Sequence, residues 1–458
     1  MKSTDSIRRQ RSRRDFLQQS GAAVAGVVAG VNAMGLSIPA VHAAEDHTLR
    51  IALVGCGGRG SGAGIDAVAA AAQVKLGPVK IYALADVFEN RLRGTADAYA
   101  DQIPDQFDCP VERQFAGFDG YREAIDSLRP GDLVLLATPP TFRPMHVEYA
   151  VSRGVNVFME KSFAVDPPGV RRMLRNGKAA TEKNLKVAGG LMSRHSIPLQ
   201  ECIGRIHDGI IGDVTTIRAY REHDMVGFSP RAEGESELAH QIRNYSNFTW
   251  VNGSFMLDWL IHNLDVSCWT KGMWPVSAQG QGGRASRTVK DQLFDHYSVE
   301  YRFDDGTTLI AQGRHQPHSW GFFGDIVVGT KGCAVLGEGI GNPQIFKGWK
   351  MTSENLIWEH KGEFNPQYRT EHEVLQRAIR EDRPHNETEH CCWATMTGLL
   401  GLAASESGME ETWDGLLAAE KSLADVDALT SFDSPAPVTA DADGNYPIAI
   451  PGVTRTFQ

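Results

Sequence analysis

The sequence predicts an α/β protein in which a doubly wound parallel sheet precedes a second, α+β domain with several strands. The chain has 458 residues, which is too long for one ordinary core. Between residues 49 and 189, short β-branched apolar runs alternate with helical segments, as in a parallel sheet with helices on both faces. After about Met192 the strand-like stretches 214–220, 297–303, 307–312 and 325–328 show partial apolar–polar alternation, which indicates a sheet with one covered face.

The first 43 residues differ in kind from the rest of the chain. Five arginines within residues 8–14 precede a weakly apolar stretch at 21–40, and residues 41–43 offer a cleavage site. This is the three-part layout of a secretory signal, and Ser12-Arg13-Arg14-Asp15-Phe16-Leu17 resembles a twin-arginine signal. We therefore expect a periplasmic or otherwise exported protein. The alternative is an uncleaved anchor, since the stretch is about long enough to span a bilayer.

A glycine-rich loop follows the first expected strand, residues 49–54. The loop is Gly55-Cys56-Gly57-Gly58-Arg59-Gly60, a G-x-G-x-x-G, and an Ala-rich helical stretch follows it at 65–73. A dinucleotide site requires this order. The first glycine permits the tight turn, the second lets the backbone approach a pyrophosphate, and the third lets helix and strand pack closely. The helix N-terminus then stabilises the phosphate charge.

The second expected strand, residues 80–85, ends at Asp86. A carboxylate there can accept hydrogen bonds from the adenosine ribose hydroxyls and would repel a 2′-phosphate. We therefore expect NAD as the cofactor. Arg91 and Arg93 lie just beyond and leave NADP open, and the alternative for Asp86 is an ordinary carboxylate at a strand end.

The alternation continues to residue 189. Helices are expected at 121–128, 143–152 and 168–184, and strands at 133–137, 155–159 and 185–189. A loop follows the strand at 133–137, and Glu160-Lys161-Ser162 stands at the end of the strand at 155–159. Because ligands of open α/β sheets bind outside the carboxyl ends of the strands, Glu160 and Lys161 are placed to meet a nicotinamide ring and a substrate.

Composition and charge exclude several classes of partner. The formal net charge is −10, which argues against a nucleic-acid partner or an anionic membrane surface. After residue 43 no segment approaches ~18 uninterrupted apolar residues, so we expect no stable membrane insertion after cleavage. The seven cysteines have no C-x-x-C spacing, which favours buried thiols over a disulfide framework or a zinc site.

Taken together, the motifs resemble the Gfo/Idh/MocA family of oxidoreductases, typified by glucose–fructose oxidoreductase and inositol dehydrogenase. The matching pieces run in order over nearly the whole chain after residue 43. They are the loop 55–60, Asp86, Thr138-Pro139 with His146, Glu160-Lys161, Arg194, Asp258-x-x-x-His262 and 329–332. Glu371-His372, 395–397 and 412–414 resemble the exported, sugar-active branch, including relatives of the NAD-dependent α-N-acetylgalactosaminidases. One departure is Ser162, which stands where the family has a proline that would fix the backbone.

The resemblance implies an N-terminal NAD(P)-binding Rossmann domain and a C-terminal domain with a large open, mainly antiparallel sheet. We divide the chain into a signal peptide at 1–43, the cofactor domain at 44–191, a substrate and oligomerisation domain at 192–430 and an extended arm at 431–458. A homodimer or homotetramer is usual for the resemblance. The residues it assigns to the cofactor are Gly55, Gly57, Gly58, Arg59, Gly60, Asp86, Thr138, Pro139, His146, Glu160 and Lys161.

Asp258, His262 and Asp265 stand at i, i+4 and i+7, so a helix would place them on one face. Metal ligation and a structural polar face compete with catalysis here. The flanking residues supply no further obvious ligand, so we expect no metal. The resemblance makes Asp258 and His262 the family's acid–histidine pair. In alcohol oxidation His262 would act as the base, Lys161 would stabilise the alkoxide and Asp258 would orient the groups; His262 and Lys161 could exchange roles.

Three further residues are weaker candidates for substrate contacts: Arg194, Tyr245 and Trp250. Aromatic rings stack on sugars, but such residues more often pack in a core. His315 and His318 lack acidic neighbours and are expected to be structural or substrate-facing rather than metal ligands.

Export limits the reaction that such a protein would carry out. Free nicotinamide cofactors are not expected to be recycled outside the cytoplasm, so an exported enzyme would retain its cofactor and regenerate it within each turnover. We expect hydride transfer between a secondary alcohol of a sugar or polyol and a tightly bound NAD(P). The alternatives are a glycoside hydrolase that borrows and returns a hydride, and a non-catalytic carbohydrate-binding protein.

Overall fold

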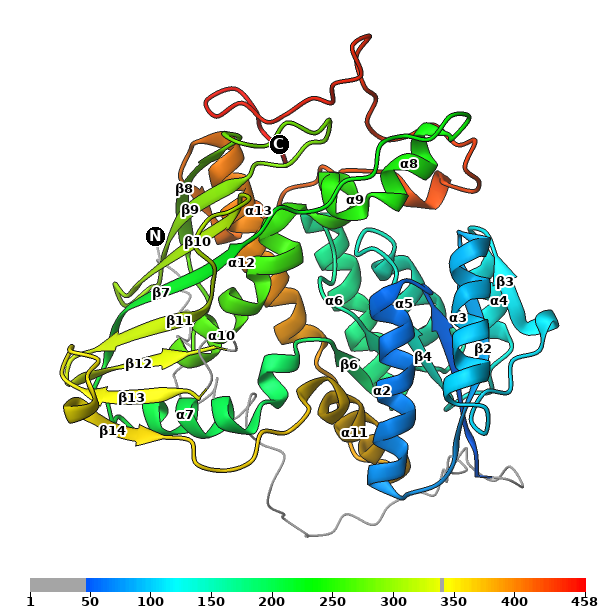
Figure 1. Cartoon of the computed structure of the whole chain (residues 1–458), viewed down its shortest axis with the longest axis horizontal. Coiled ribbons are helices and arrows are strands. Elements are labelled where there is room, and N and C mark those ends of the chain that lie inside the picture. Colours follow the sequence, from blue (N-terminus) through cyan, green and yellow to red (C-terminus); the bar gives the residue numbers. More distant parts are fainter. Residues whose placement is uncertain (1–46, 338–341) are drawn as a thin grey trace, which may run out of the picture.

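Two β-sheets organise the computed structural model, which describes residues 47–337 and 342–458 (Figure 1). The six-stranded sheet has the order β3-β2-β1-β4-β5-β6, and the nine-stranded sheet has the order β14-β13-β12-β11-β7-β10-β9-β8-β15. Neighbours in the first sheet are parallel. In the second sheet β10 and β7 are parallel and the other neighbours are antiparallel. The predicted fold class, a doubly wound parallel sheet followed by a large, mainly antiparallel one, is confirmed.

The first sheet and its helices come from the N-terminal half of the described chain. The strands are β1 (Leu49–Val54), β2 (Val79–Asp86), β3 (Gln114–Ala116), β4 (Leu133–Leu136), β5 (Asn156–Met159) and β6 (Val187–Gly189). The helices are α2 (Gly58–Val74), α3 (Glu89–Gln102), α4 (Gly120–Asp126), α5 (Arg143–Ser152) and α6 (Pro167–Glu182). The strands predicted from residue 49 to residue 189 are confirmed. The structure adds α3 and β3, which have too few apolar residues to stand out in the sequence.

The first sheet is covered on both faces, which explains why its central strands are almost wholly apolar. Successive residues of β1 pack on opposite sides: Leu49, Ile51 and Leu53 join one apolar cluster with α2 and α3. Ala52 and Val54 join another with α4, α5 and α6. Every residue of β4 and β5 is buried. The polar groups at their carboxyl ends are therefore held on a rigid platform.

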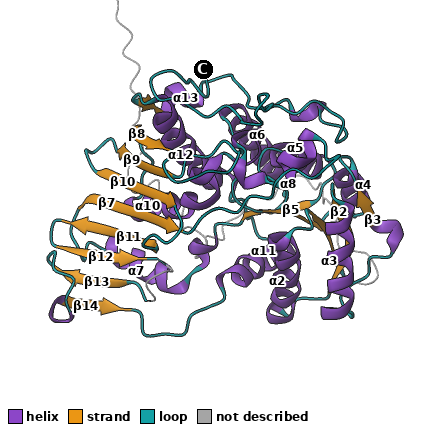
Figure 2. Ribbon diagram, turned by 45° about the horizontal axis from the view of Figure 1, so that its top comes forward, coloured by secondary structure: helices purple, strands orange, loops and turns teal. Residues whose placement is uncertain are grey.

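The second sheet takes the later part of the chain (Figure 2). Its strands are β7 (Val214–His223), β8 (Ser277–Gly283), β9 (His296–Arg302), β10 (Thr308–His315), β11 (Phe322–Gly329), β12 (Gly332–Leu336), β13 (Gln344–Lys347), β14 (Leu356–Glu359) and β15 (Glu411–Thr412). The helices of this part are α7 (Ile197–His207), α8 (Glu237–Arg243), α9 (Thr249–Asn252), α10 (Ile261–Lys271), α12 (Thr388–Ser407) and α13 (Trp413–Leu417). Buried and partly exposed residues alternate along β10, as predicted for a sheet with one covered face.

Short helical turns complete the described elements. They are η1 (Val111–Arg113), η2 (Met192–His195), η3 (Tyr245–Asn247), η4 (Met256–Leu260), η6 (Ser353–Asn355) and η7 (Val426–Ala428). η4 is π-helical and runs directly into α10. The predicted acid–histidine pair spans this junction, with Asp258 in η4 and His262 in α10.

After the second sheet the chain returns to the first. α11 (Gln367–Arg380) packs along α2, and the Gln376 side chain donates to the Ala67 carbonyl at 2.7 Å. Beyond α12, residues 431–458 contain neither helix nor strand. They cross the molecule beside α8 and α9, as the red trace in Figure 1 shows. Phe432 stacks on Phe88 of the first domain with ring centroids 5.1 Å apart, so this arm connects the two halves.

All seven cysteines are buried and free. In residues 47–337 and 342–458 we find no helix with the length and apolar character needed to cross a bilayer. The signal peptide predicted at 1–43 lies outside the described residues.

Candidate active site

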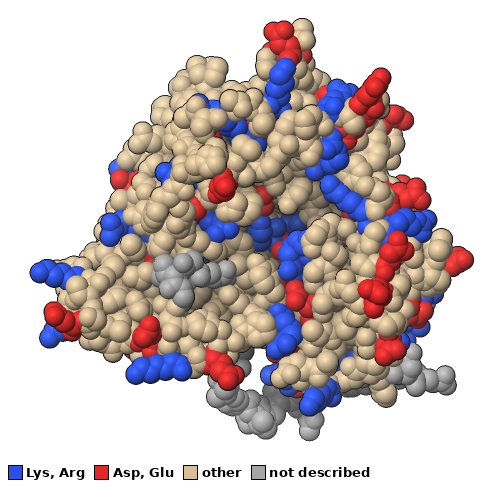
Figure 3. Space-filling model, in the orientation of Figure 1, with Lys and Arg blue, Asp and Glu red and all other residues tan. Residues whose placement is uncertain are grey.

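A cleft opens where β1, β2, β4 and β5 end, at the carboxyl edge of the six-stranded sheet. Its empty volume is about 1180 Å³ including the open mouth. The first domain contributes the loop 55–60, Asp86, Thr138-Pro139 and Glu160-Lys161, and the second contributes Tyr245, Asn252 and Asp258. Figure 3 shows the molecule hollowed between its two halves, with Lys and Arg side chains along the border. Open α/β sheets bind their ligands in such a crevice.

The glycine loop has the geometry that a phosphate-binding turn needs. Gly55 has φ +99°, and a Cβ there would lie 2.7 Å from the Ala137 carbonyl carbon. A Cβ on Gly60 would lie 1.8 Å from the Gly55 oxygen, so close packing of helix and strand requires glycine. A Cβ on Gly57 or Gly58 would meet nothing within 4 Å. No side chain caps the first turn of α2, so its N–H groups and dipole are available to a pyrophosphate.

Asp86 lies at the end of β2 and lines the cleft. Its two carboxylate oxygens accept backbone N–H groups from Cys56 at 2.7 Å and Phe88 at 2.8 Å. Burial raises the pKa of this carboxyl group, against the effect of those hydrogen bonds. Arg91 also lines the cleft. Arg93 does not, because it bonds to Gln114 and Glu89.

Thr138 and His146 form the next part of the wall. The Thr138 hydroxyl lies 3.1 Å from His146 Nδ1, and the His146 ring stacks on Tyr121 with centroids 4.1 Å apart. Burial lowers the pKa of His146 to about 3. This imidazole is therefore neutral at neutral pH, and together with Pro139 it shapes the cleft without adding charge.

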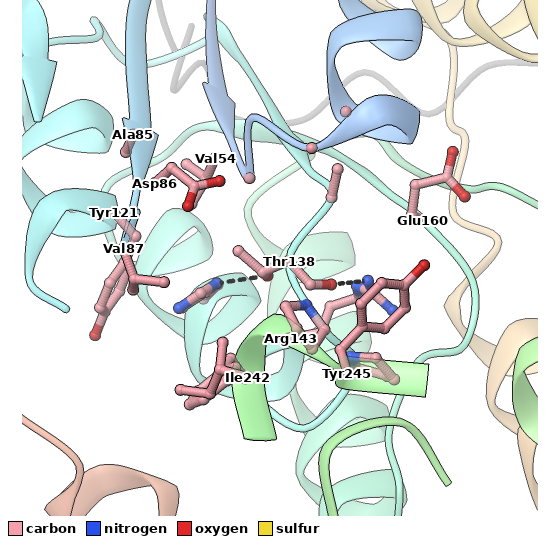
Figure 4. Close-up of a pocket in the computed structure, with 18 of the residues that line it drawn as sticks. Val54, Ala85, Asp86, Val87, Tyr121, Thr138, Arg143, Glu160, Ile242 and Tyr245 are labelled. Atoms are coloured by element: carbon pink, nitrogen blue, oxygen red, sulfur yellow. Dashed lines mark hydrogen bonds between the residues drawn. The ribbon is translucent and has the colours of Figure 1, made fainter. Parts of the chain in front are cut away.

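Glu160 is buried at the end of β5 and pairs with the glycine loop. Arg59 Nε lies 2.8 Å from one Glu160 oxygen, and Arg59 also contacts Asp66 at 2.9 Å. Figure 4 shows Glu160 on the opposite side of the cleft from Asp86. The Arg59–Glu160 pair therefore ties the phosphate-binding loop to the strand that carries Lys161.

Lys161 reaches across the cleft to the second domain. Its Nζ lies 2.9 Å from Asp258 Oδ1, and it also donates to the Asp258 carbonyl oxygen. The other carboxylate oxygen of Asp258 accepts from the Ser246 hydroxyl at 2.7 Å. The Lys161–Ser162 peptide bond is cis, and Ser162 Oγ donates to the Leu257 carbonyl. Serine stands where the family that the sequence resembles has proline, and the contacts of the Lys161 ammonium hold it against Asp258.

His262 lies behind this pair, in α10. Its ring is buried beside Phe323 and does not line the cleft. Its Nδ1 has no hydrogen-bond partner among the described residues. Burial, and next the charge of Lys161, hold the pKa of His262 well below its usual range. In the described contacts the Asp258 carboxylate binds Lys161 and Ser246 rather than the His262 ring.

The i, i+4, i+7 set does not form one polar face, because its members have separate surroundings: Asp258 pairs with Lys161, His262 lies beside Phe323, and Asp265 pairs with Arg194. Asp265 instead takes three hydrogen bonds from Arg194, the shortest 2.8 Å. In that ion pair Asp265 is buried and the Arg194 side chain is 12% exposed, and Arg194 does not line the cleft.

The two aromatic candidates are also separated. Tyr245 lines the cleft, and the negative charge of Asp258 raises its pKa. Trp250 is buried beside Phe142 and donates to Gln241 at 2.6 Å, which makes it a packing residue.

His315 is a structural residue. Its Nε2 lies 2.8 Å from the Phe294 carbonyl oxygen, and burial lowers its pKa to about 4. Within the described ranges no group of three or more His, Cys, Asp and Glu side chains is arranged to hold a metal ion.

The sequence motifs assign no role to two residues that line the cleft, Arg143 and Asn252, or to Ser246 beside Asp258. Arg143 and Asn252 are lining residues, and Ser246 contacts Asp258. The sequence places Arg143 on a helix but gives no sign that it points inward. Asn252 and Ser246 lie in short helical segments whose orientation only the tertiary structure determines.

No protein-family model matches the chain, and no curated protein matches it either. Solved structures do share its fold. Levoglucosan dehydrogenase in complex with NADH and levoglucosan is 14% identical, covers 80% of this chain and 99% of its own, and has a TM-score of 0.61. Scyllo-inositol dehydrogenase from Lactobacillus casei is 18% identical, covers 80% of this chain and 98% of its own, and has a TM-score of 0.58. An aldose–aldose oxidoreductase from Caulobacter crescentus complexed with glycerol is 16% identical, covers 80% of this chain and 99% of its own, and has a TM-score of 0.59. The chain therefore has the fold of Gfo/Idh/MocA-type dehydrogenases.

Proposed function

We propose that this protein is an NAD(P)-dependent oxidoreductase of the Gfo/Idh/MocA type that acts on a sugar or polyol. One observation carries the proposal: a Lys161–Asp258 ion pair at 2.9 Å lies in the same cleft as an uncapped glycine loop and a strand-end aspartate. The fold neighbours are named for inositol, levoglucosan and aldoses, which supports the carbohydrate class.

The cleft fits a nicotinamide dinucleotide. The loop 55–60 and the first turn of α2 would hold the pyrophosphate, and Asp86 would hold the adenosine ribose. A buried carboxylate beside that ribose favours NAD over NADP. Fold neighbours that contain NADH support this choice. When bound, the cofactor supplies a hydride acceptor for the carbon of a secondary alcohol.

The protein groups around Lys161 would manage the alcohol proton. The Lys161 ammonium, held by Asp258, can donate to the substrate oxygen and stabilise its developing negative charge. His262 is neutral at neutral pH because burial lowers its pKa, so it can accept a proton. Since His262 does not line the cleft, the alcohol proton would reach it through Lys161, which would give one proton to His262 as it takes one from the substrate hydroxyl.

We further propose export by the twin-arginine pathway, on the sequence of residues 1–43. An exported enzyme of this kind would keep its cofactor and return the hydride within each cycle. We propose a homo-oligomer built through the outer face of the nine-stranded sheet. Trp320 and Trp349 are exposed and lie in the loops after β10 and β13, and large exposed apolar side chains of this kind support such an interface.

The test is the nicotinamide content of the purified mature protein. The protein is denatured and the supernatant is assayed for NAD(H) and NADP(H). About one NAD(H) per chain supports a retained cofactor and a redox-neutral reaction between carbohydrates. A protein that purifies empty and binds neither dinucleotide on titration contradicts the proposal. Release of an aglycone from glycosides without net NADH would replace it with a redox-assisted glycoside hydrolase.

A further inference from the structure

We infer that Arg143 and Asn252 form a binding site for an oxyanion of the substrate, so that the substrate is a sugar acid or a sugar phosphate rather than a neutral sugar. The inference deepens the proposed function and rests on it. Both residues line the cleft, and no sequence motif assigns either a role.

The Arg143 side chain is buried, fixed and incompletely bonded. Only 1% of the residue's surface is exposed. One terminal nitrogen donates to the Thr138 carbonyl oxygen, which anchors the guanidinium group. Its Nε and Nη1 are buried and have no hydrogen-bond acceptor among residues 47–337 and 342–458. Figure 4 shows the bond to Thr138 and places the group next to the ring of Tyr245.

Asn252 adds a second donor in the same condition. The residue is 2% exposed, and its Nδ2 is buried without an acceptor in the part of the chain that the structure describes. The segments that carry the two residues are held together, since Thr141 N donates to the Val251 carbonyl oxygen at 3.3 Å. Buried donors without acceptors are costly, typically ~1–3 kcal/mol each and more for charged groups. Two such donors in one cleft indicate a ligand rich in acceptor oxygens.

Charge balance favours an anion over a hydroxyl group. Three basic side chains lie near Glu160 and Asp258 in the described structure. Lys161 contacts Asp258 and Arg59 contacts Glu160 and Asp66, whereas Arg143 contacts no carboxylate. Burial lowers the pKa of Arg143 to about 10, so the group stays charged at neutral pH. A buried cation without a counter-ion is unfavourable, and an anionic ligand would remove that cost.

The position of Arg143 favours the substrate over the cofactor as its ligand. The acidic groups that act on its charge are Glu160 and Asp258, at the Lys161 end of the cleft. The phosphates of a dinucleotide would lie instead at the glycine loop and the first turn of α2. An oxyanion on Arg143 would thus hold a sugar with one hydroxyl near Lys161.

The test compares matched pairs of ligands on the NAD-loaded protein. The pairs are an aldonate with its alditol, a uronate with its aldose, and a hexose phosphate with its hexose. The variants are Arg143→Met, Arg143→Lys and Asn252→Leu, with Arg175→Met as the control because Arg175 is exposed. Binding is measured by calorimetry on the NADH-loaded protein, and turnover by nicotinamide absorbance. Nicotinamide content and circular dichroism check that each variant folds.

We expect wild type to bind the acid of at least one pair ~10-fold or more tightly than its neutral partner. Arg143→Met should lose ~10- to 100-fold in affinity and kcat/KM for that acid, with the neutral partner nearly unchanged. Arg143→Lys should recover part of the loss. The pair that responds identifies the oxyanion as carboxylate or phosphate.

Three results would overturn the inference. One is a wild-type protein that binds acids and neutral partners alike, which needs no variant to measure. The second is an Arg143→Met protein that loses nicotinamide and not acid discrimination, which would make Arg143 a cofactor residue. The third is an equal loss on both members of each pair. Failure of the proposed function looks different, since then no carbohydrate, acidic or neutral, reduces the bound NAD.

Discussion

Lys161, Asp258 and His262 divide the chemistry of the cleft among three environments. Lys161 is ion-paired and lines the cleft, and Asp258 contacts both Lys161 and Ser246. His262 is buried, and within the described ranges its Nδ1 has no hydrogen-bond partner. The sequence identifies all three through the family resemblance. It does not show that Asp258 binds the lysine rather than the histidine, because that contact joins residues 97 positions apart.

Asp86 should set the choice between dinucleotides. We expect Asp86→Ser to weaken NAD binding ~10-fold or more and to improve NADP binding, because it removes a carboxylate that repels a 2′-phosphate. Arg91→Ala should then lower the gained NADP affinity, since Arg91 lines the cleft. Arg93→Ala is the control, as that side chain bonds elsewhere. Dissociation constants from calorimetry check this, and an unchanged NAD-to-NADP ratio in Asp86→Ser would contradict it.

His262 should determine the acid limb of the pH–rate profile. A base must be neutral to accept a proton, and the pKa of His262 is held well below 6.5. Activity of wild type should therefore persist as the pH falls through 6.5. We expect His262→Ala to reduce kcat ~100-fold or more while NAD stays bound. Full activity of this variant on a confirmed substrate would show that another group is the base.

At the scale of single elements, strands were easier to predict than helix contacts. The apolar runs of β1, β4 and β5 follow from burial on both faces, which needs no knowledge of the partners. The π-helical turn η4 could not be predicted, because its extra residue per turn depends on packing around Met256–Leu260. The docking of α11 on α2 is a contact between distant segments, and only its amphipathic pattern is visible in the sequence.

α11 should make the fold sensitive to acid through His372. This residue is fully buried against Phe158, neither ring nitrogen has a hydrogen-bond partner among the described residues, and burial lowers its pKa to about 3. An unfolded histidine titrates near 6.5. Between those values the unfolded chain binds a proton that the folded chain does not, so stability is full above pH 6.5 and falls below it. At pH 5 this difference in proton binding should lower the free energy of unfolding by about 2 kcal/mol relative to its value above pH 6.5.

Chemical denaturation at pH 8 and pH 5 measures this effect. Between pH 8 and pH 5 the free energy of unfolding of His372→Phe should fall by about 2 kcal/mol less than that of wild type. Replacing the exposed His318 by Asn should leave the wild-type difference unchanged. Equal pH dependence of His372→Phe and wild type would mean that His372 is not a source of acid sensitivity.

At the scale of the whole molecule, the arm at 431–458 fastens the second domain over the cleft. Tyr446 is buried edge-on against Phe248 at 4.8 Å and donates to Glu237. Leu429, just before the arm, lines the cleft. The sequence indicates an extended tail here from its Pro, Asp and Gly content, but the surface that the tail covers is set by tertiary packing.

Loss of the arm's anchor should therefore affect both stability and the cofactor. We expect Tyr446→Ala to lower the free energy of unfolding by ~3–5 kcal/mol, the usual cost of removing a large buried aromatic ring. Release of bound nicotinamide should become faster in the variant. Val453→Ala, an exposed position in the same arm, is the control. If Tyr446→Ala were as stable as wild type in thermal unfolding, the contacts of Tyr446 would not stabilise the fold.

The most direct measurement mixes the NAD-loaded protein with carbohydrates and follows the formation of NADH in the cleft within a single turnover. Wild type should produce NADH with at least one sugar, polyol or sugar acid. Lys161→Met should bind NAD equally well and form NADH ~100- to 10,000-fold more slowly, because it lacks the ammonium that stabilises the alkoxide. Lys178→Met, at an exposed lysine, should behave like wild type. NADH formation by Lys161→Met at the wild-type rate, or none by wild type with any carbohydrate, would contradict the account.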